Sequence, residues 1–214
     1  MKHLNAEKYN LAWFKLAECV SRGEKERALG VYRLLSHSVG SDALAKQLFG
    51  DLLLCFNEKE RAIQQYKQAA ETYKKRGKII ESIAIYEHLL TLNPHDEDDM
   101  FDLCALYAQS QLGFKIAYHV GNLLQKSKLD FALKLVKKYD DMLSDIESLQ
   151  VHCEVSLVCI RDKTISRDVV LGQLEKVLDK LAIETQKHLL QDFLLKVELE
   201  DESYHQHARE YLQK

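Results

Sequence analysis

The sequence predicts an all-α fold, arranged as an α-α superhelix, or solenoid, of about twelve helices. The first observation behind this prediction is the spacing of the helix-breaking residues. The breakers are Gly23, Gly40, Asn57, Gly77 and Pro94, at intervals of 17, 17, 20 and 17 residues. Each interval can hold one helix and its turn, which is typical of a helical solenoid. The second observation is composition: one proline and eight glycines are too few for the turns of a β-sandwich or barrel, whereas residue types that favour helices abound.

The individual helices are placed by these breakers and by apolar residues at helical spacing. The first helix is expected over residues 6–21. One helix is expected between Gly23 and Gly40, and another between Gly77 and Pro94. The other helices are expected over residues 41–56, 58–76, 97–110, 114–126, 129–143, 146–161, 166–182, 186–199 and 201–213.

Composition and charge argue against several classes of function. The chain has 214 residues, 46% of them apolar, and can bury a hydrophobic core. Its net charge of −3 gives no overall attraction for nucleic acid. The start, MKHLNAEKYN, lacks the apolar core of a signal peptide. No apolar run approaches the roughly 18 residues that a membrane span needs. We therefore expect a cytoplasmic protein with no membrane span and no nucleic-acid partner.

The sequence contains no motif that points to catalysis or metal binding. GxSxG, HExxH, P-loop and GxGxxG patterns are absent, so we expect neither an enzyme nor a cofactor. His205 and His207 are two residues apart, which places them on different helical faces and argues against a shared metal ion. The five cysteines form no CxxC pair, and each is expected to be a core thiol: Cys19, Cys55, Cys104, Cys153 and Cys159.

The stretch from Ile63 to Asp96 has the most regular pattern in the chain. It is predicted to form two helices joined at Gly77, the second ending before Pro94. Large and small residues recur at helical spacing on the two helices, at Tyr66, Ala69, Ala70, Tyr73, Ser82, Tyr86 and Leu89. In these positions the stretch resembles a tetratricopeptide repeat (TPR), whose period is 34 residues. It departs from the family pattern at Ala70, where glycine is usual, and at Ser82 and Leu89, where alanine is usual.

The same resemblance extends to other parts of the chain. It is firm over residues 12–38, weaker over 41–57 and 97–126, and absent beyond. We therefore divide the chain into a TPR-like repeat region, residues 1–128, and a helical C-terminal extension of degenerate repeats or capping helices, residues 129–214. The aromatic residues at repeat positions are expected to be buried between adjacent helices: Trp13, Tyr32, Tyr66, Tyr73 and Tyr86.

Helix 58–76 fits two frames of the repeat pattern. It can be the second helix of a repeat that starts at Ala43, or the first helix of the repeat that starts at Ile63. We prefer the frame from Ile63 because it includes the proline stop. In a stacked array each helix packs on both neighbours, so the choice of frame does not alter the expected architecture.

The resemblance also implies where a partner would bind. In the TPR family, the first helix of each repeat lines a concave groove that holds a peptide or helix of another protein. By that resemblance, the partner-binding positions here are Phe14, Glu18, Gln64, Lys67, Glu71, Lys74, Asp98, Phe101 and Asp102. Such a surface suits a ligand with basic and apolar residues. Some family members clamp a C-terminal carboxylate with basic side chains, but Glu18, Asp98 and Asp102 occupy matching positions and would repel one.

The acidic run over residues 96–102 has a second interpretation. Acids in the first turn of a helix complement the helix dipole and cap free N–H groups. On that interpretation the acids only start the helix after Pro94 and bind nothing.

The function expected from the sequence is that of a protein–protein interaction module, adaptor or scaffold. Two alternatives stay open: a secretion-type TPR chaperone that holds an extended client, and a regulatory or enzymatic role for the C-terminal helices. A co-purified extended peptide would favour the first, and a deep polar pocket between the last helices would favour the second.

Overall fold

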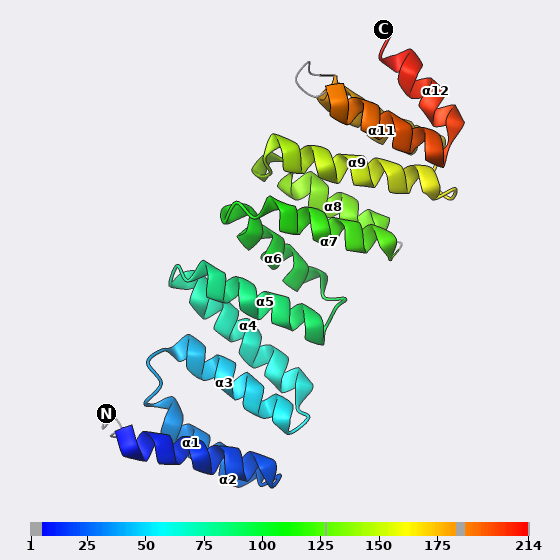
Figure 1. Cartoon of the computed structure of the whole chain (residues 1–214). Helices are drawn as coiled ribbons and strands as arrows, with labels where there is room; N and C mark the ends of the chain where they lie inside the picture. The colour runs from blue at the N-terminus through cyan, green and yellow to red at the C-terminus, as the bar shows by residue number, and fades with distance from the viewer. Residues whose placement is uncertain (1–5, 127, 183–186, 214) are drawn as a thin grey trace. The chain divides into compact units, whose positions relative to one another are not determined.

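The computed structural model describes residues 6–126, 128–182 and 187–213 (Figure 1). Within these residues it contains twelve α-helices, one short 3₁₀ helix and no strand, which confirms the all-α prediction. The α-helices are α1 (Ala6–Ser21), α2 (Lys25–Ser36), α3 (Asp42–Cys55), α4 (Lys59–Lys75), α5 (Ile79–Leu92), α6 (Glu97–Gln109), α7 (Gly113–Gln125), α8 (Leu129–Tyr139), α9 (Asp145–Arg161), α10 (Arg167–Leu181), α11 (Lys187–Glu200) and α12 (Glu202–Tyr211). The α-helix expected over 129–143 ends at Tyr139, and the residues after it form the short 3₁₀ helix η1 (Asp140–Met142).

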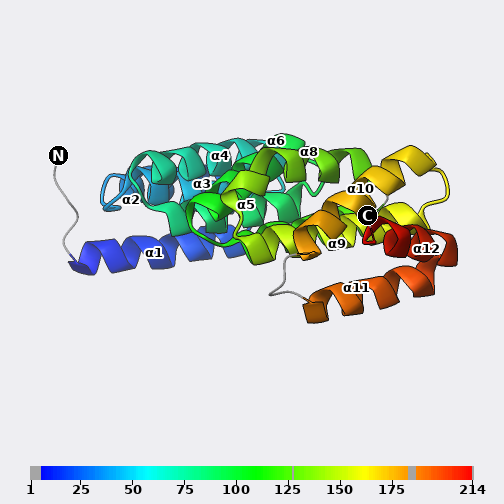
Figure 2. The ribbon, with the colours of Figure 1, turned by 90° about the horizontal axis from the view of Figure 1, so that it is seen from above.

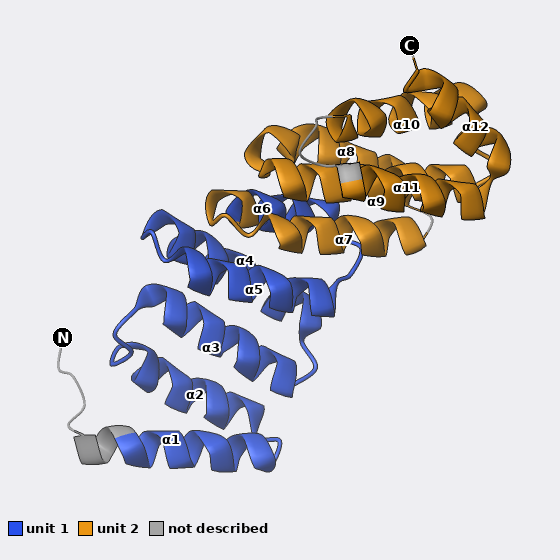
Figure 3. Cartoon of the chain, turned by 45° about the horizontal axis from the view of Figure 1, so that its top comes forward, with its two compact units in different colours: residues 1–106 blue, residues 107–214 orange. Residues whose placement is uncertain are grey.

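The chain divides into two compact units, residues 1–106 and residues 107–214 (Figure 3). The boundary between the units falls within α6. The division at 128/129 concerns similarity to a repeat pattern rather than compactness, and it stays a prediction.

In unit 1, α4 packs against both of its neighbours in sequence, α3 and α5. Figures 1 and 2 show these three helices running side by side. The chain turns sharply between them because Asn57 and Gly77 adopt left-handed backbone conformations, with φ of 58° and 72°. Glycine takes this conformation without steric penalty, and asparagine tolerates it better than most residues. The expectation that helix 58–76 contacts both neighbours is confirmed.

The aromatic residues of the repeat positions form much of the core of unit 1. Tyr32, Tyr66, Tyr73 and Tyr86 are all buried, as predicted. Trp13 is only partly buried, so its prediction was wrong in degree. It lies on α1, the first helix, which packs mainly against α2.

The cysteines are free thiols and differ in burial. Cys104 and Cys159 are buried, as expected for core thiols, and Cys19 and Cys153 are partly buried. Cys55 is exposed, so the prediction of a core thiol was wrong there. It is the last residue of α3, where the preceding leucines occupy the buried side of the helix.

Unit 2 is built around α9, which packs against α7, α10 and α11. A capping box starts this helix: Ser144 accepts a hydrogen bond from the backbone N–H of Glu147, and the Glu147 side chain accepts one from the backbone N–H of Ser144. Most residues of α9 are buried, including the polar Ser148, His152 and Ser156 at intervals of four. Residues four apart share one helical face, so a buried polar stripe runs along α9.

Candidate functional site

The sequence-predicted partner-binding residues of α4 share one face of that helix. Gln64, Lys67, Glu71 and Lys74 follow each other at spacings of three and four residues. Gln64 is exposed and the other three are partly buried. Lys67 and Lys74 both reach residues at or beside the N-terminal half of α6, so the face continues from α4 onto α6. We call this surface the α4–α6 face.

Lys67 ties α4 to the beginning of α6. Its Nζ lies 2.9 Å from a carboxylate oxygen of Asp96 and 2.9 Å from one of Asp99. Asp96 also caps the helix, since its Oδ1 accepts a hydrogen bond of 3.0 Å from the backbone N–H of Asp99. The helix-start interpretation of the acidic run therefore holds for Asp96.

The pKa values at this junction follow from burial and charge. Asp99 is only 3% exposed, and burial raises the pKa of its carboxyl, although Lys67 opposes the change. Burial disfavours the charged form of Lys67, but hydrogen bonds to Asp96 and Asp99 outweigh this and raise its pKa. For Asp96, burial opposes ionisation, but the backbone N–H of Asp99 and the ammonium of Lys67 lower the pKa. The three side chains thus form one ion-paired cluster.

A second cluster lies one to two helical turns further along α4. Its members are Glu71, Lys74, Tyr86 and Asp102. Lys74 Nζ lies 3.4 Å from Asp102 Oδ1 and 3.6 Å from Glu71 Oε1. The hydroxyl of Tyr86, from α5, is 3.0 Å from Glu71 and 3.2 Å from Asp102. Burial, followed by the charges of Asp102 and Glu71, raises the pKa of Tyr86, so the hydroxyl stays protonated and donates. This cluster joins α4, α5 and α6.

Phe101 and Asp102 follow Asp98 by three and four residues, so both lie on the same side of α6 as Asp98. Asp98 is exposed, and its side chain makes no hydrogen bond or ion pair with the residues that the structure describes. Phe101 is partly buried. The face therefore presents one exposed carboxylate beside a partly buried aromatic ring.

Phe14 and Glu18, the remaining predicted positions, lie on α1. The side chain of Phe14 is 75% exposed. Glu18 forms an ion pair of 2.6 Å with Arg22 of its own helix. Among the residues that the structure describes, no hydrogen bond or ion pair joins either side chain to the α4–α6 face.

The α4–α6 face is rich in carboxylates. Glu71 and Asp102 share one lysine, Lys74, and Asp98 adds an exposed carboxylate. The side chains of Glu71 and Asp102 are 42% and 46% exposed, so solvent reaches both carboxylates. The ion pairs of Lys74 with these carboxylates are therefore exposed to solvent. Exposed ion pairs contribute little to the free energy of unfolding.

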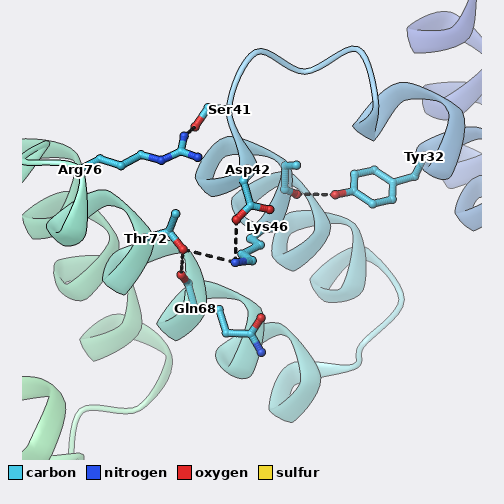
Figure 4. Close-up of polar contacts among 8 residues, drawn as sticks. Tyr32, Ser41, Asp42, Lys46, Gln68, Thr72 and Arg76 are labelled. Carbon is cyan, nitrogen blue, oxygen red and sulfur yellow. Dashed lines mark hydrogen bonds and ion pairs between the residues drawn. The ribbon is translucent and has the colours of Figure 1, made fainter. Parts of the chain in front are cut away.

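A set of polar contacts on the other side of α4 was not predicted from the sequence (Figure 4). Lys46 of α3 lies 2.9 Å from Asp42 and 3.3 Å from the hydroxyl of Thr72. Arg76 donates to the hydroxyl of Ser41 at 3.2 Å. These contacts join the start of α3 to the end of α4, and their partners are 26 and 35 residues apart, too far for helical spacing to indicate.

A partly buried polar cluster in unit 2 was also missed. Asp140 of η1 accepts a hydrogen bond from Ser148. It lies 3.1 Å from Nε2 of His152 and 3.4 Å from Nζ of Lys180. The available signal was the spacing of Ser148 and His152 among apolar residues of one helix, which places two polar groups on a face that must be buried.

The described residues include no group of three or more His, Cys, Asp or Glu side chains arranged to hold a metal ion. His205 and His207 contact different carboxylates, Glu198 at 4.0 Å and Glu175 at 3.1 Å. Burial raises the pKa of Cys153 to about 12 and that of Cys159 to about 11, so both thiols are protonated at neutral pH. Within the described ranges, no helix has the length and apolar character to cross a membrane.

Comparison with protein-family models and with curated proteins gives no match to this chain. The likeness to the tetratricopeptide repeat therefore rests on the residue pattern given above.

Proposed function

We propose that the protein is an interaction module that binds a basic segment of a partner protein on the α4–α6 face. The observation that carries this proposal is the excess of acids on this face: its two lysines, Lys67 and Lys74, pair with Asp96 and Asp99 and with Glu71 and Asp102, and the exposed Asp98 adds a fifth carboxylate. The TPR-like pattern supports it, because this face belongs to the helices that would line the groove of that family. The negative charge of the face also disfavours nucleic acid.

The charge pairs on this face leave room for an incoming ligand. Lys74 is held at 3.4 and 3.6 Å by carboxylates that are themselves nearly half exposed. Exchange of such a pair for a pair with a partner's lysine or arginine changes the free energy little, because exposed pairs are worth about 0 to 1 kcal/mol. Asp98 needs no exchange at all. Phe101 beside it offers apolar contact for the stem of a basic side chain.

Asp98 is the position that tests this proposal most cleanly. Substitution of Asp102 would also disturb Lys74 and Tyr86, whereas the Asp98 side chain makes no hydrogen bond or ion pair with the described residues. Its matched control is Glu97, the adjacent exposed acid in the first turn of the same helix. Asp98→Lys and Glu97→Lys have the same charge change and the same unfavourable effect on the helix dipole. They differ in the face of α6 that they alter.

The partner is first captured from cells with the wild-type protein, identified by mass spectrometry and purified. Its affinity and association rate are then measured for both variants at two salt concentrations. Asp98→Lys should weaken binding about three- to tenfold, mainly through slower association, and Glu97→Lys should have a smaller effect. High salt should weaken wild-type binding, since exposed charges are screened over about 8 Å at physiological ionic strength. An unchanged affinity for Asp98→Lys together with a lowered melting temperature would overturn the proposal and leave the acids as a helix start.

A further inference from the structure

An apolar groove in unit 2 has no part in the proposed function. Figure 1 shows α7, α9 and α11 side by side, and α9 contacts both of the other helices. The groove among them has a volume of about 460 Å³. Its buried lining residues are Leu149 of α9, Leu181 at the end of α10 and Phe193 of α11. Ala117 lines it from α7. The inner surface of the groove is therefore apolar.

Large apolar side chains lie exposed at the edge of this groove. Ile146 and Leu189 line it and are exposed to solvent. Phe114 is more than half exposed and lies about one helical turn before Ala117. The backbone N–H of Phe114 donates a hydrogen bond of 3.0 Å to Glu147, the residue after Ile146, and this bond joins the starts of α7 and α9. An exposed aromatic ring thus lies next to the apolar groove.

A combination of this kind is typical of a protein contact surface. Soluble proteins seldom leave several neighbouring large apolar side chains in water, and such patches with a polar rim mark contacts with other molecules. Aromatic side chains are enriched at the centre of protein–protein contacts. We call the groove and its exposed neighbours Phe114, Ile146 and Leu189 the α7–α11 surface.

The charged residues of this surface have both signs. Glu154 of α9 and Asp192 and Lys196 of α11 line the groove and are exposed. None of the three side chains forms a hydrogen bond or ion pair with the residues that the structure describes. Asp192 and Lys196 are four residues apart, a spacing at which an ion pair could form within the helix. Since they do not pair, all three charges remain for a contact with another molecule.

We propose that the α7–α11 surface binds the same surface of a second copy of the chain, which gives a symmetric dimer. A two-fold contact uses one patch twice, so the patch must complement itself. It does so in shape, because Phe114 and Ile146 of one copy would fill the groove of the other. It does so in charge, because Lys196 of one copy would meet Glu154 or Asp192 of the other. A rim of a single sign would repel itself and would indicate a different partner.

Sedimentation of the full chain over a range of concentrations tests this inference. The wild type should form dimers whose share rises with concentration. Phe114→Asp and Ile146→Asp should each raise the dissociation constant of the dimer roughly tenfold or more, because each places a charge in an apolar contact. The matched control is Ile80→Asp. Ile80 is the second residue of α5, as Ile146 is of α9, and both are more than half exposed. The control should change the dissociation constant less than about twofold.

A charge exchange shows whether the partner is a second copy. Lys196→Glu leaves only acids among the charged residues of the groove, and the double variant Glu154→Lys, Asp192→Lys leaves only bases. Each should self-associate about fivefold more weakly than the wild type, because like charges then face each other. An equal mixture of the two should recover association to within about threefold of the wild type. A different protein or a small molecule in the groove would not produce this recovery.

Three results would overturn the inference. The first is a wild-type chain that stays monomeric up to about 0.5 mM, well above the micromolar range of specific association. The second is an equal effect of Ile80→Asp and Ile146→Asp, which would place the contact elsewhere. The third is a mixture of the two charge variants that associates no better than either alone. Melting temperatures verify that each variant is folded. The α4–α6 face takes no part in these measurements, so their failure would leave the proposed function untouched.

Discussion

The packing of α3 on α4 and that of α4 on α5 are two versions of one arrangement. In each, a tyrosine of the later helix donates its hydroxyl to an acid of the earlier helix, fifteen residues before it: Tyr66 to Asp51, and Tyr86 to Glu71. The residue just before each acid is small, Gly50 in the first case and Ala70 in the second. The arrangement thus recurs from one helix to the next, and α4 takes part in both contacts.

The two contacts differ in how the helices approach each other. At Gly50, a Cβ atom would lie 2.8 Å from the Tyr66 ring, so only glycine fits there. At Ala70 a methyl group is accommodated, and the Ala70 carbonyl accepts a hydrogen bond of 3.0 Å from the buried Ser82 hydroxyl. The first contact depends on close packing and the second adds a polar bond. Ala70 and Ser82 are thus joined by a hydrogen bond that the first contact, with Gly50 and Ala62 in the corresponding positions, does not have.

The largest expected effect comes from removing either tyrosine ring. Tyr66 is 1% exposed and Tyr86 is 3% exposed. Tyr66→Ala and Tyr86→Ala should each lower the free energy of unfolding by about 3 to 5 kcal/mol, as other buried aromatic deletions do. Denaturant unfolding followed by circular dichroism measures this. A loss of less than about 1 kcal/mol at either site would mean that the two contacts are not equivalent.

Much of this arrangement could be predicted from the sequence. The breakers and helical spacing located the helices, and the buried positions of Tyr32, Tyr66, Tyr73 and Tyr86 followed from the repeat pattern. Trp13 and Cys55 were less buried than expected because burial depends on neighbours in space. Trp13 lies on a terminal helix, and Cys55 lies at the end of its helix. Helical spacing within one element contains no information about either circumstance.

The next largest effect tests the glycine contact. Gly50→Ala should lower the free energy of unfolding by about 1 to 3 kcal/mol, because the added methyl would overlap the Tyr66 ring. Gly30→Ala is the matched control. Gly30 also lies inside a helix of unit 1, but a Cβ there would meet nothing within 4 Å. The control should raise stability by about 0.5 to 1 kcal/mol, since alanine favours helices over glycine. Two changes of the same sign and size would contradict the packing difference.

The candidate sites were less predictable than the fold. Gln64, Lys67, Glu71 and Lys74 were placed on one face correctly, because that follows from spacing along α4. The ion pairs of Lys67 with Asp96 and Asp99 join residues about thirty apart, and they form because the start of α6 lies within reach of the Lys67 side chain. The contacts of Asp140 with His152 and Lys180 depend in the same way on η1, α9 and α10 lying together. Contacts of this kind follow from the packing of separate elements, which a motif does not specify.

A smaller effect is expected at the polar bond that distinguishes the α4–α5 contact. Ser82→Ala should cost about 1 kcal/mol, the usual value of a single hydrogen bond, since alanine fits the same space. Ala62 occupies the corresponding position in the α3–α4 contact and is fully buried. Ala62→Ser is therefore the informative converse, measured in the same unfolding assay. If Ser82→Ala were neutral or stabilising, the Ser82 hydroxyl would not contribute to the second contact.

The smallest effect at neutral pH concerns the tyrosine hydroxyls, and it grows in alkali. Tyr66→Phe and Tyr86→Phe keep both rings and should each lower the free energy of unfolding by about 0.5 to 1 kcal/mol at pH 7.

Burial raises the pKa of both tyrosines above 10.0, helped by Asp51 at Tyr66 and by Asp102 and Glu71 at Tyr86. In the unfolded chain tyrosine ionises near pH 10. Above that pH the unfolded state therefore binds fewer protons than the folded state, and the free energy of unfolding falls as pH rises. Each phenylalanine variant should flatten this fall between about pH 10 and 12, so that wild type and variant converge in stability. The two sites should differ at pH 7, since the Tyr86 hydroxyl lies between two carboxylates, whereas the Tyr66 hydroxyl donates to the carboxylate of the exposed Asp51. Urea unfolding across this pH range measures both effects, and a wild-type slope retained in the double variant would show that other groups cause the alkaline loss.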